Sequence, residues 1–208
     1  VQGAGRVARA ARAAGADRMV HVSGIGADPR SRSRYVAARG LGEARVRVAF
    51  RDAHLLRPGV LFGPGDAFLH TLELVTRLPA VPLFGRGSVR LQPVHVDDAG
   101  AAVAAVAAGR GDAPRTLELG GADVLAYRAV VEQVLRHLGR RRLLVPVPMR
   151  AWHALAGLAA LLPSPPITRD QVVLMESDNL ARGPGFGALG MNPRGLVASL
   201  DACLPRAA

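Results

Sequence analysis

Three residues near the start of the chain have types and a spacing suited to proton and hydride chemistry. Ser23 closes a short apolar segment of strand type, Tyr35 begins a helical pattern twelve residues later, and Arg39 stands one helical turn further on. A serine hydroxyl can hold a carbonyl oxygen, and a phenol, which ordinarily titrates at ~10, exchanges a proton near neutrality when a cation lies close to it. The spacing fits a site where hydride passes between a nicotinamide ring and a substrate; simple packing of the tyrosine is the alternative.

The elements expected to position these side chains alternate between strand and helix. Short apolar runs predict strands over 18–23, 53–57, 89–96, 116–119 and 143–147. Apolar residues at helical spacing predict helices over 5–14, 35–50, 66–78, 97–109, 127–138 and 149–161, followed by a joint at Pro163, Pro165 and Pro166 and a last polar helical portion. Asp97 and Asp98 are the N-cap candidates for the helix that ends at Gly109. The alternation predicts an α/β domain with a largely parallel sheet.

The charge of the chain is large but carries little information about partners. All 27 basic residues of the 208 are arginines, against 16 acidic residues, which gives a formal net charge of +11. A face that tracks phosphates needs clustered cations with aromatic residues between them. Here the arginines are spread along the chain and aromatic residues make up 4%. We therefore expect no nucleic-acid partner, although an arginine-rich module for nucleic acid or anionic lipid stays open as an alternative.

Two further classes are excluded by composition. Cys203 is the single cysteine, so neither an internal disulfide framework nor a multi-cysteine zinc site is expected, and no metal site is expected at all. The most apolar run, 151–162, is too short to cross a bilayer and ends at Pro163, so we expect no transmembrane span.

A dinucleotide-binding fingerprint of the G-x-G-x-x-A type occurs at Gly3, Gly5 and Ala8, with Asp28 placed near the distance at which a ribose-binding acid is expected. Such a fingerprint binds pyrophosphate only where a strand ends and a helix begins. Only two residues precede Gly3 in this sequence. We therefore interpret the glycines as part of a glycine-rich helix start.

Four segments occur in an order that resembles the extended or atypical short-chain dehydrogenase/reductases. They read Val20-His-Val-Ser-Gly-Ile-Gly-Ala-Asp28, Tyr35-x-x-x-Arg-x-x-Gly-Glu43, Leu56-Arg-Pro-Gly-Val-Leu-Phe-Gly-Pro-Gly-Asp66 and Gln92-Pro-Val-His-Val-Asp-Asp98. Later segments resemble the carboxyl-terminal part of the same group: Pro166-Ile-Thr-Arg-Asp-Gln171, Ser177-Asp-Asn179 and Leu189-Gly190. Within the family, the resemblance is greatest to the NAD(P)H-binding accessory subunits of respiratory complex I and their bacterial homologues.

The resemblance implies a role for each matching position. Ser23, Tyr35 and Arg39 fall where the family has its catalytic serine, tyrosine and lysine. The cofactor-binding set would be Ser23, Gly24, Tyr35, Arg39, Pro58, Gly59, Val60 and Phe62, with residues 58–60 at the nicotinamide carboxamide. On the substrate side would lie Asp66, Gln92 and His95, with Phe62 and Asp66 at the pocket mouth. A structural alternative is that Asp98 caps a helix and His95 packs on a strand.

The sequence departs from the family in two ways. Arginine stands at the lysine position, and its long planar fork does not replace a compact ammonium, which puts reductase turnover in doubt. The strands and helices that carry the phosphate loop in the family have no counterpart here, so we expect a truncated domain with impaired dinucleotide binding. The implied cofactor is NADP or NAD, with NADPH favoured. The expected division is a partial Rossmann-like NAD(P)-binding domain over 1–108 and a small helical, substrate-side portion over 109–208.

Three functions remain in competition. The first is an NAD(P)H-binding accessory or assembly component of a quinone-linked respiratory complex with weak or no catalysis. Its partners would be respiratory-complex subunits or quinone-linked proteins, and its location cytoplasmic or peripheral at the inner face of the membrane. The second is an active NAD(P)-dependent reductase, epimerase or dehydratase for a small carbonyl or sugar-like substrate. The third is the arginine-rich binding module.

Overall fold

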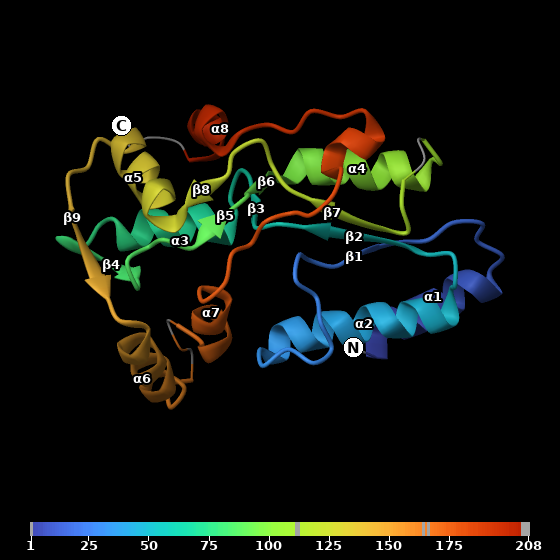
Figure 1. Ribbon diagram of the computed structural model, residues 1–208, viewed down its shortest axis with the longest axis horizontal. Helices are drawn as coiled ribbons and strands as arrows, with labels where there is room; N and C mark the ends of the chain where they lie inside the picture. Colours follow the sequence, from blue (N-terminus) through green and yellow to red (C-terminus); the bar gives the residue numbers. More distant parts are fainter. Residues whose placement is uncertain (1, 111–112, 164, 166, 205–208) are drawn as a thin grey trace.

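The structure is a computed structural model that describes residues 2–110, 113–163, 165 and 167–204 (Figure 1). Pro166, the last member of the expected proline-rich joint, lies outside the described residues. Among the described helices, none combines the length and the apolar character that a membrane span requires.

A sheet of three parallel strands, β1 (Val20–Val22), β2 (His54–Pro58) and β7 (Thr116–Leu119), is covered by helices on both faces (Figure 1). Helices α1 (Gln2–Ala13) and α2 (Arg34–Ala49) cover one face, and α4 (Val96–Ala107) covers the other. Neighbouring residues of a strand point to opposite faces, so in the central strand Leu55 packs with α1 and α2, while Leu56 packs with α4. This is the layered α/β arrangement that the alternation of elements predicts.

A glycine allows α1 and α2 to pack closely. A Cβ atom at Gly5 would lie 3.2 Å from Arg45 Cβ, which is tighter than usual, whereas one at Gly42 would make an ordinary contact 3.8 Å from Ala4 Cβ. The glycine-rich start of the chain lies inside α1, where it serves contact between helices. The interpretation of Gly3 and Gly5 as part of a helix is therefore confirmed.

The remaining strands form three short pairs around a second core. The parallel pairs are β3 (Leu61–Phe62) with β6 (Val94–His95) and β4 (Ala80–Phe84) with β9 (Leu143–Val147). The antiparallel pair is β5 (Arg90–Leu91) with β8 (Leu125–Ala126). Helices α3 (Ala67–Val75), α5 (Tyr127–His137) and α8 (Leu196–Cys203) enclose this core, while α6 (Met149–Ala159), α7 (Arg169–Leu174) and the short 3₁₀ helix η1 (Gly185–Leu189) complete the chain.

The structure corrects three expectations. The strand expected over 89–96 divides into β5 and β6 on either side of Gln92 and Pro93, because proline cannot donate to a ladder. Strands β3, β4 and β8 were not expected: a proline and glycine-rich sequence conceals β4, and β3 and β8 have only two residues each. The N-cap of α4 is His95 rather than Asp97 or Asp98, since its ring nitrogen Nδ1 accepts from the Asp97 backbone N–H.

The expected boundary at 108/109 separates two strands that share one sheet. β7, from the second portion, pairs along its whole length with β2 of the first. The core around the three-stranded sheet therefore contains residues from both 1–108 and 109–208. The division into two domains stays a prediction.

Candidate functional site

The structure brings Ser23, Tyr35 and Arg39 together at the carboxyl end of β1. Arg39 Nη1 donates to the Ser23 carbonyl oxygen at 2.8 Å, and Arg39 Nη2 donates to the Tyr35 hydroxyl. The Arg39 guanidinium carbon also lies 4.5 Å from the centroid of the Tyr35 ring, a cation–π distance. The arginine therefore joins the end of the strand to the start of α2.

Gly24 makes room for the arginine. A Cβ atom at this position would overlap the Arg39 guanidinium. Gly40, one residue beyond Arg39, has a similar role, because a Cβ there would overlap the backbone at Pro29. The loop over 24–33 can thus fold against α2, whose start is fixed by the Ser33 hydroxyl, an acceptor for the Val36 backbone N–H at 3.3 Å.

The two hydroxyls of the site differ in exposure. Ser23 is 5% exposed, and its Oγ has no hydrogen-bond partner among the described residues. Tyr35 is 46% exposed, although its hydroxyl is held by Arg39. An orphaned buried hydroxyl is unfavourable and is a place where a ligand can supply the missing partner. The cluster therefore offers a buried hydroxyl, with the Glu43 carboxylate near it, beside a phenol that solvent reaches.

A row of charged groups lies next to Ser23, across the ends of the strands. Arg57 of β2 donates to both Glu43 oxygens, at 2.8 and 2.6 Å, and contacts Glu118 of β7 at 3.5 Å. Burial acts to raise the pKa of Glu43, but the hydrogen bonds from Arg57, helped by the nearby Ser23 hydroxyl, lower it below its usual value. Glu43 is therefore a carboxylate at neutral pH. Glu43 ends one of the segments that resemble the family, but the sequence did not predict that it pairs with Arg57.

The backbone groups of residues 58–60, the segment expected at a nicotinamide carboxamide, form hydrogen bonds with other parts of the protein. Gly59 N–H donates to the Leu119 carbonyl at 2.9 Å, and Val60 N–H donates to Asn179 Oδ1 at 3.1 Å. Gly59 is required here, because a Cβ would lie 2.6 Å from the Gln92 carbonyl oxygen. Pro58 closes β2, and its carbonyl accepts from the Ile25 N–H at 3.0 Å.

Phe62 and Asp66 have structural contacts that differ from the expected pocket mouth. Phe62 is fully buried, and its ring meets the His95 ring edge-on at 5.2 Å between centroids. Asp66 is the N-cap of α3 and accepts from the Leu69 N–H at 2.9 Å and the Gly63 N–H at 3.1 Å. Phe62 is therefore closed off from solvent, whereas Asp66 is half-buried, and the place of the two at a pocket mouth stays a prediction.

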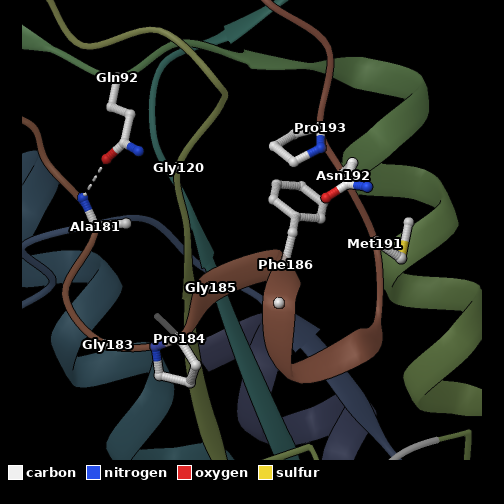
Figure 2. A pocket seen from close by; sticks show the side chains of 11 residues that line it. Gln92, Gly120, Ala181, Gly183, Pro184, Gly185, Phe186, Met191, Asn192 and Pro193 are labelled. Atoms are coloured by element: carbon white, nitrogen blue, oxygen red, sulfur yellow. Dashed lines mark hydrogen bonds between the residues drawn. The ribbon is translucent and has the colours of Figure 1, made fainter.

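Gln92 links three segments of the chain. Its Nε2 donates to the Gly121 carbonyl at 2.9 Å, and its Oε1 accepts from the Ala181 N–H at 3.0 Å (Figure 2). Gly120 lies against the same side chain, where a Cβ atom would overlap it. With both ends of its amide used, Gln92 holds the loop after β7 to the segment after Asn179.

His95 and Asp98 belong to a buried junction with the end of the chain. His95 Nε2 lies 3.6 Å from Cys203 Sγ, and its Nδ1 lies 3.3 Å from Arg194 Nη1. Asp98 accepts from the Arg194 backbone N–H at 2.7 Å and pairs with its Nε at 3.1 Å. The expectation that His95 packs on a strand is confirmed, and Asp98 anchors Arg194 instead of capping a helix. No local pattern singles out Arg194.

A cavity of about 260 Å³ lies beside η1 (Figure 2), and neither Ser23 nor Tyr35 is among the residues that line it. Its lining includes Gln92, Phe186 and Asn192 together with a glycine-rich turn. Gly185, Gly187 and Gly190 repeat the G-x-G-x-x-G spacing, but they form a 3₁₀ turn rather than a junction between a strand and a helix. This segment is thus no pyrophosphate cradle of the Rossmann type.

No protein-family model matches the chain, but curated proteins and solved structures do. The chain is 33% identical, over 76% of its length and 41% of the relative, to the NADH-ubiquinone oxidoreductase 40 kDa subunit of Neurospora crassa. It is 29% identical, over 90% of its length and 51% of the relative, to the NADH dehydrogenase (ubiquinone) 1 alpha subcomplex subunit 9 of Rattus norvegicus. It is 41% identical, over 50% of its length and 32% of the relative, to a ceramide reductase of Caulobacter vibrioides.

Solved structures give the fold. MoeE5 in complex with UDP-glucuronic acid and NAD matches with a TM-score of 0.69 at 19% identity, over 98% of this chain and 69% of that one. The UDP-glucose 4-epimerase of Thermotoga maritima matches with a TM-score of 0.67 at 18% identity, over 96% and 66%.

The chain spans about half the length of the two respiratory relatives that it matches. The expected Rossmann-like α/β fold is confirmed by the structural matches, and the expected resemblance is confirmed by the sequence matches. The chain is a relative of the complex I accessory subunits, built on the fold of the NAD-dependent epimerases and other extended short-chain dehydrogenase/reductases.

Proposed function

We propose that this chain takes the nicotinamide end of a dinucleotide at the Ser23–Tyr35–Arg39 cluster and acts as an accessory or assembly component of a quinone-linked respiratory complex, with weak or no catalysis. The observation that carries the proposal is the hold of Arg39 on both the Ser23 carbonyl and the Tyr35 hydroxyl. The sequence similarity to the complex I subunits supports the proposed accessory or assembly role. Such a component would work in the cytoplasm, at the inner face of the membrane that holds the complex.

The described residues suit a nicotinamide group at one end. Ser23 Oγ is a buried hydroxyl that has no hydrogen bond of good geometry among the described residues, although the Glu43 carboxylate lies near it, and Tyr35 beside it is half-exposed. Gly24, Pro58, Gly59 and Val60 would complete the wall around the ring. A bound nicotinamide dinucleotide supplies or accepts a hydride. The protein's part is to orient the ring with Ser23 and Tyr35 and to exchange a proton at the Tyr35 hydroxyl.

Arg39 is a poor replacement for a catalytic lysine in this geometry. A guanidinium does not deprotonate in proteins and has a fixed planar fork. Here two of its nitrogens are used by protein acceptors, one of them a backbone carbonyl. The arginine therefore has less freedom to follow a proton or a ribose hydroxyl, and the cluster favours binding over turnover.

We further propose NADPH as the preferred dinucleotide and weak affinity for this chain. The two glycine spacings that could cradle a pyrophosphate lie in α1 and in η1, not where a strand meets a helix N-terminus. The nicotinamide end would then be recognised without the phosphate contacts that supply much of the affinity in this fold.

Calorimetric titration of the chain with NADPH and with NADH tests the proposal. We expect weak binding, tighter for NADPH, that is lost in Tyr35→Ala, together with no consumption of NADPH over a panel of quinone and carbonyl substrates. Leu74→Ala, an exposed position on α3, is the matched control and should bind as the parent does. Low-micromolar affinity would contradict the weak-binding part, and binding that survives Tyr35→Ala would contradict the assignment of the site.

A reductase is the second candidate, because the chain is 41% identical to a ceramide reductase over half its length. The two candidates differ at Arg39. If Arg39→Lys creates turnover of NADPH with a long-chain ketone, the site is a weakened catalytic one. If NADPH binds and neither residue gives turnover, the accessory role stands.

A further inference from the structure

Helix α6 and the turn after it present a row of leucines to solvent. Leu155, Leu158, Leu161 and Leu162 are 49%, 66%, 83% and 54% exposed. Leu155 and Leu158 are three residues apart on α6 and therefore share one side of the helix, and Leu161 and Leu162 follow in the turn after Ala159. The stretch 151–162 contains no Asp, Glu or Arg, and His153 is its one ionisable side chain. An apolar patch of this kind on a folded protein marks an interaction surface.

The opposite side of α6 is firmly attached to the protein. Trp152 Nε1 donates to the Leu83 carbonyl at 3.0 Å, and its ring stacks on Phe84 at 4.4 Å between centroids. Ala156 is fully buried, and His153 Nε2 lies 2.7 Å from Glu176. The leucines are therefore held outward by a fixed helix, which stands at one end of the molecule beside α7 (Figure 1).

Two exposed arginines stand on the elements that carry or adjoin this leucine row. Arg150 is exposed at the start of α6. Arg169, exposed at the start of α7, reaches α6, where its Nη2 lies 3.5 Å from the position of a Cβ on Gly157. Two carboxylates also lie on this side: Glu176 is 2.7 Å from His153, and Asp170 accepts from the Ser33 hydroxyl at 2.7 Å. Both carboxylates are held by these contacts, whereas the two arginines are exposed on α6 and α7.

These features fit an anionic bilayer better than a second protein. A run of twelve uncharged residues is too short to cross a bilayer, which takes about 20 residues. A helix with one apolar side and basic residues beside it lies in the plane of the membrane interface, with its apolar side among the upper acyl chains. Arginines at the edge are attracted to acidic headgroups. A stable protein dimer buries roughly 800 Å² per partner, more than four leucine side chains supply.

We propose that α6 docks the protein on an anionic membrane surface, with Leu155, Leu158, Leu161 and Leu162 in the acyl region and Arg150 and Arg169 at the lipid phosphates. The proposal shares with the proposed function only the location at a membrane. It needs no nucleotide and makes no use of the Ser23–Tyr35–Arg39 cluster, so either can fail while the other stands.

Flotation with vesicles of phosphatidylcholine, with and without phosphatidylglycerol, tests the proposal. The protein should float with the anionic vesicles, and the double variant Leu158→Gln/Leu161→Gln should bind them about tenfold or more weakly. Arg150→Gln/Arg169→Gln should lose most of the preference for phosphatidylglycerol. Val48→Gln/Leu74→Gln, which changes exposed apolar residues on α2 and α3, is the matched control and should float like the parent.

The single tryptophan of the chain gives an independent reading, because Trp152 lies on α6 itself. Energy transfer from Trp152 to a dansyl-labelled lipid in phosphatidylglycerol vesicles, which does not need contact with the ring, should appear in the parent but not in Leu158→Gln/Leu161→Gln. Equal flotation of parent and leucine variant would overturn the proposal. So would a dimer in light scattering that this variant converts to a monomer, because the leucine row would then cover a second copy of the chain.

Discussion

Arg57 and Glu43 form a two-pronged ion pair between the central strand and α2, with N···O distances of 2.8 and 2.6 Å. Glu43 is 5% exposed, so its charge depends on this partner. Ser23 lies next to the same carboxylate. The Arg57–Glu43 pair therefore joins β2 to α2 and holds a carboxylate beside Ser23 of the candidate site.

We expect Glu43→Gln to destabilise the protein by about 3 kcal/mol, because it leaves the Arg57 guanidinium partly buried without its main partner. Urea unfolding followed by circular dichroism measures the change. Glu132→Gln removes an exposed pair with Arg128 and is the control, with an expected cost of about 0.5 kcal/mol or less. Equal costs for the two variants would show that the Glu43–Arg57 pair adds nothing.

The same pair predicts a pH dependence. The pKa of Glu43 is lowered by folding, chiefly by Arg57 acting against the effect of burial, so its contribution to stability is complete above the usual value of 4.5 and disappears as pH falls through the folded value. The free energy of unfolding of the parent should therefore fall more steeply than that of Glu43→Gln as the pH drops below the usual value of 4.5. Parallel pH profiles would contradict the assignment.

Gly24→Ala should displace the Arg39 guanidinium, because the new Cβ would occupy its place. The expected loss is about 1.5–3 kcal/mol, the range for a hydrogen bond to a charged group. A double-mutant cycle separates this effect from a general change in the backbone: in an Arg39→Ala background, Gly24→Ala should cost much less. Gly3→Ala, inside α1 with open space around it, should be neutral or stabilising. Additive costs at 24 and 39 would argue against the displacement.

The meeting of Ser23, Tyr35 and Arg39 could be predicted from sequence because it depends on local rules: a strand that ends at Ser23 and one helical turn between Tyr35 and Arg39. The acceptors of Arg39 could not, because its direction depends on the space that Gly24 leaves. The partners of Val60 and Asp98 were also unpredictable. Asn179 and Arg194 are polar residues of the carboxyl-terminal segment, and no periodicity relates them to partners more than ninety residues earlier in the chain.

Asp98 and Asp97 contact the same arginine but should differ in their contribution to stability. Asp98 has a side chain that is 10% exposed and accepts from both the backbone and the side chain of Arg194, whereas Asp97 is 64% exposed and meets only Nη1, at 3.0 Å. We expect Asp98→Ala to cost about 2 kcal/mol and Asp97→Ala about 0.5 kcal/mol or less, as measured by urea unfolding. A reversed order would mean that the exposed pair holds the junction.

Asn179 offers a test of how the site meets a dinucleotide, on the assumption that the proposed function holds. Its side-chain oxygen uses the Val60 N–H, the backbone donor expected for the nicotinamide carboxamide, and both groups are primary amides. Removing the side chain should free this donor, so Asn179→Ala should bind NADPH about three- to tenfold more tightly while losing about 1 kcal/mol of stability. Asp178→Ala is the control: it removes the neighbouring pair with Arg90 and should lower stability without changing affinity. Affinity that falls in Asn179→Ala would show instead that Asn179 supports the site, since the loss of a competing amide can only favour the ligand.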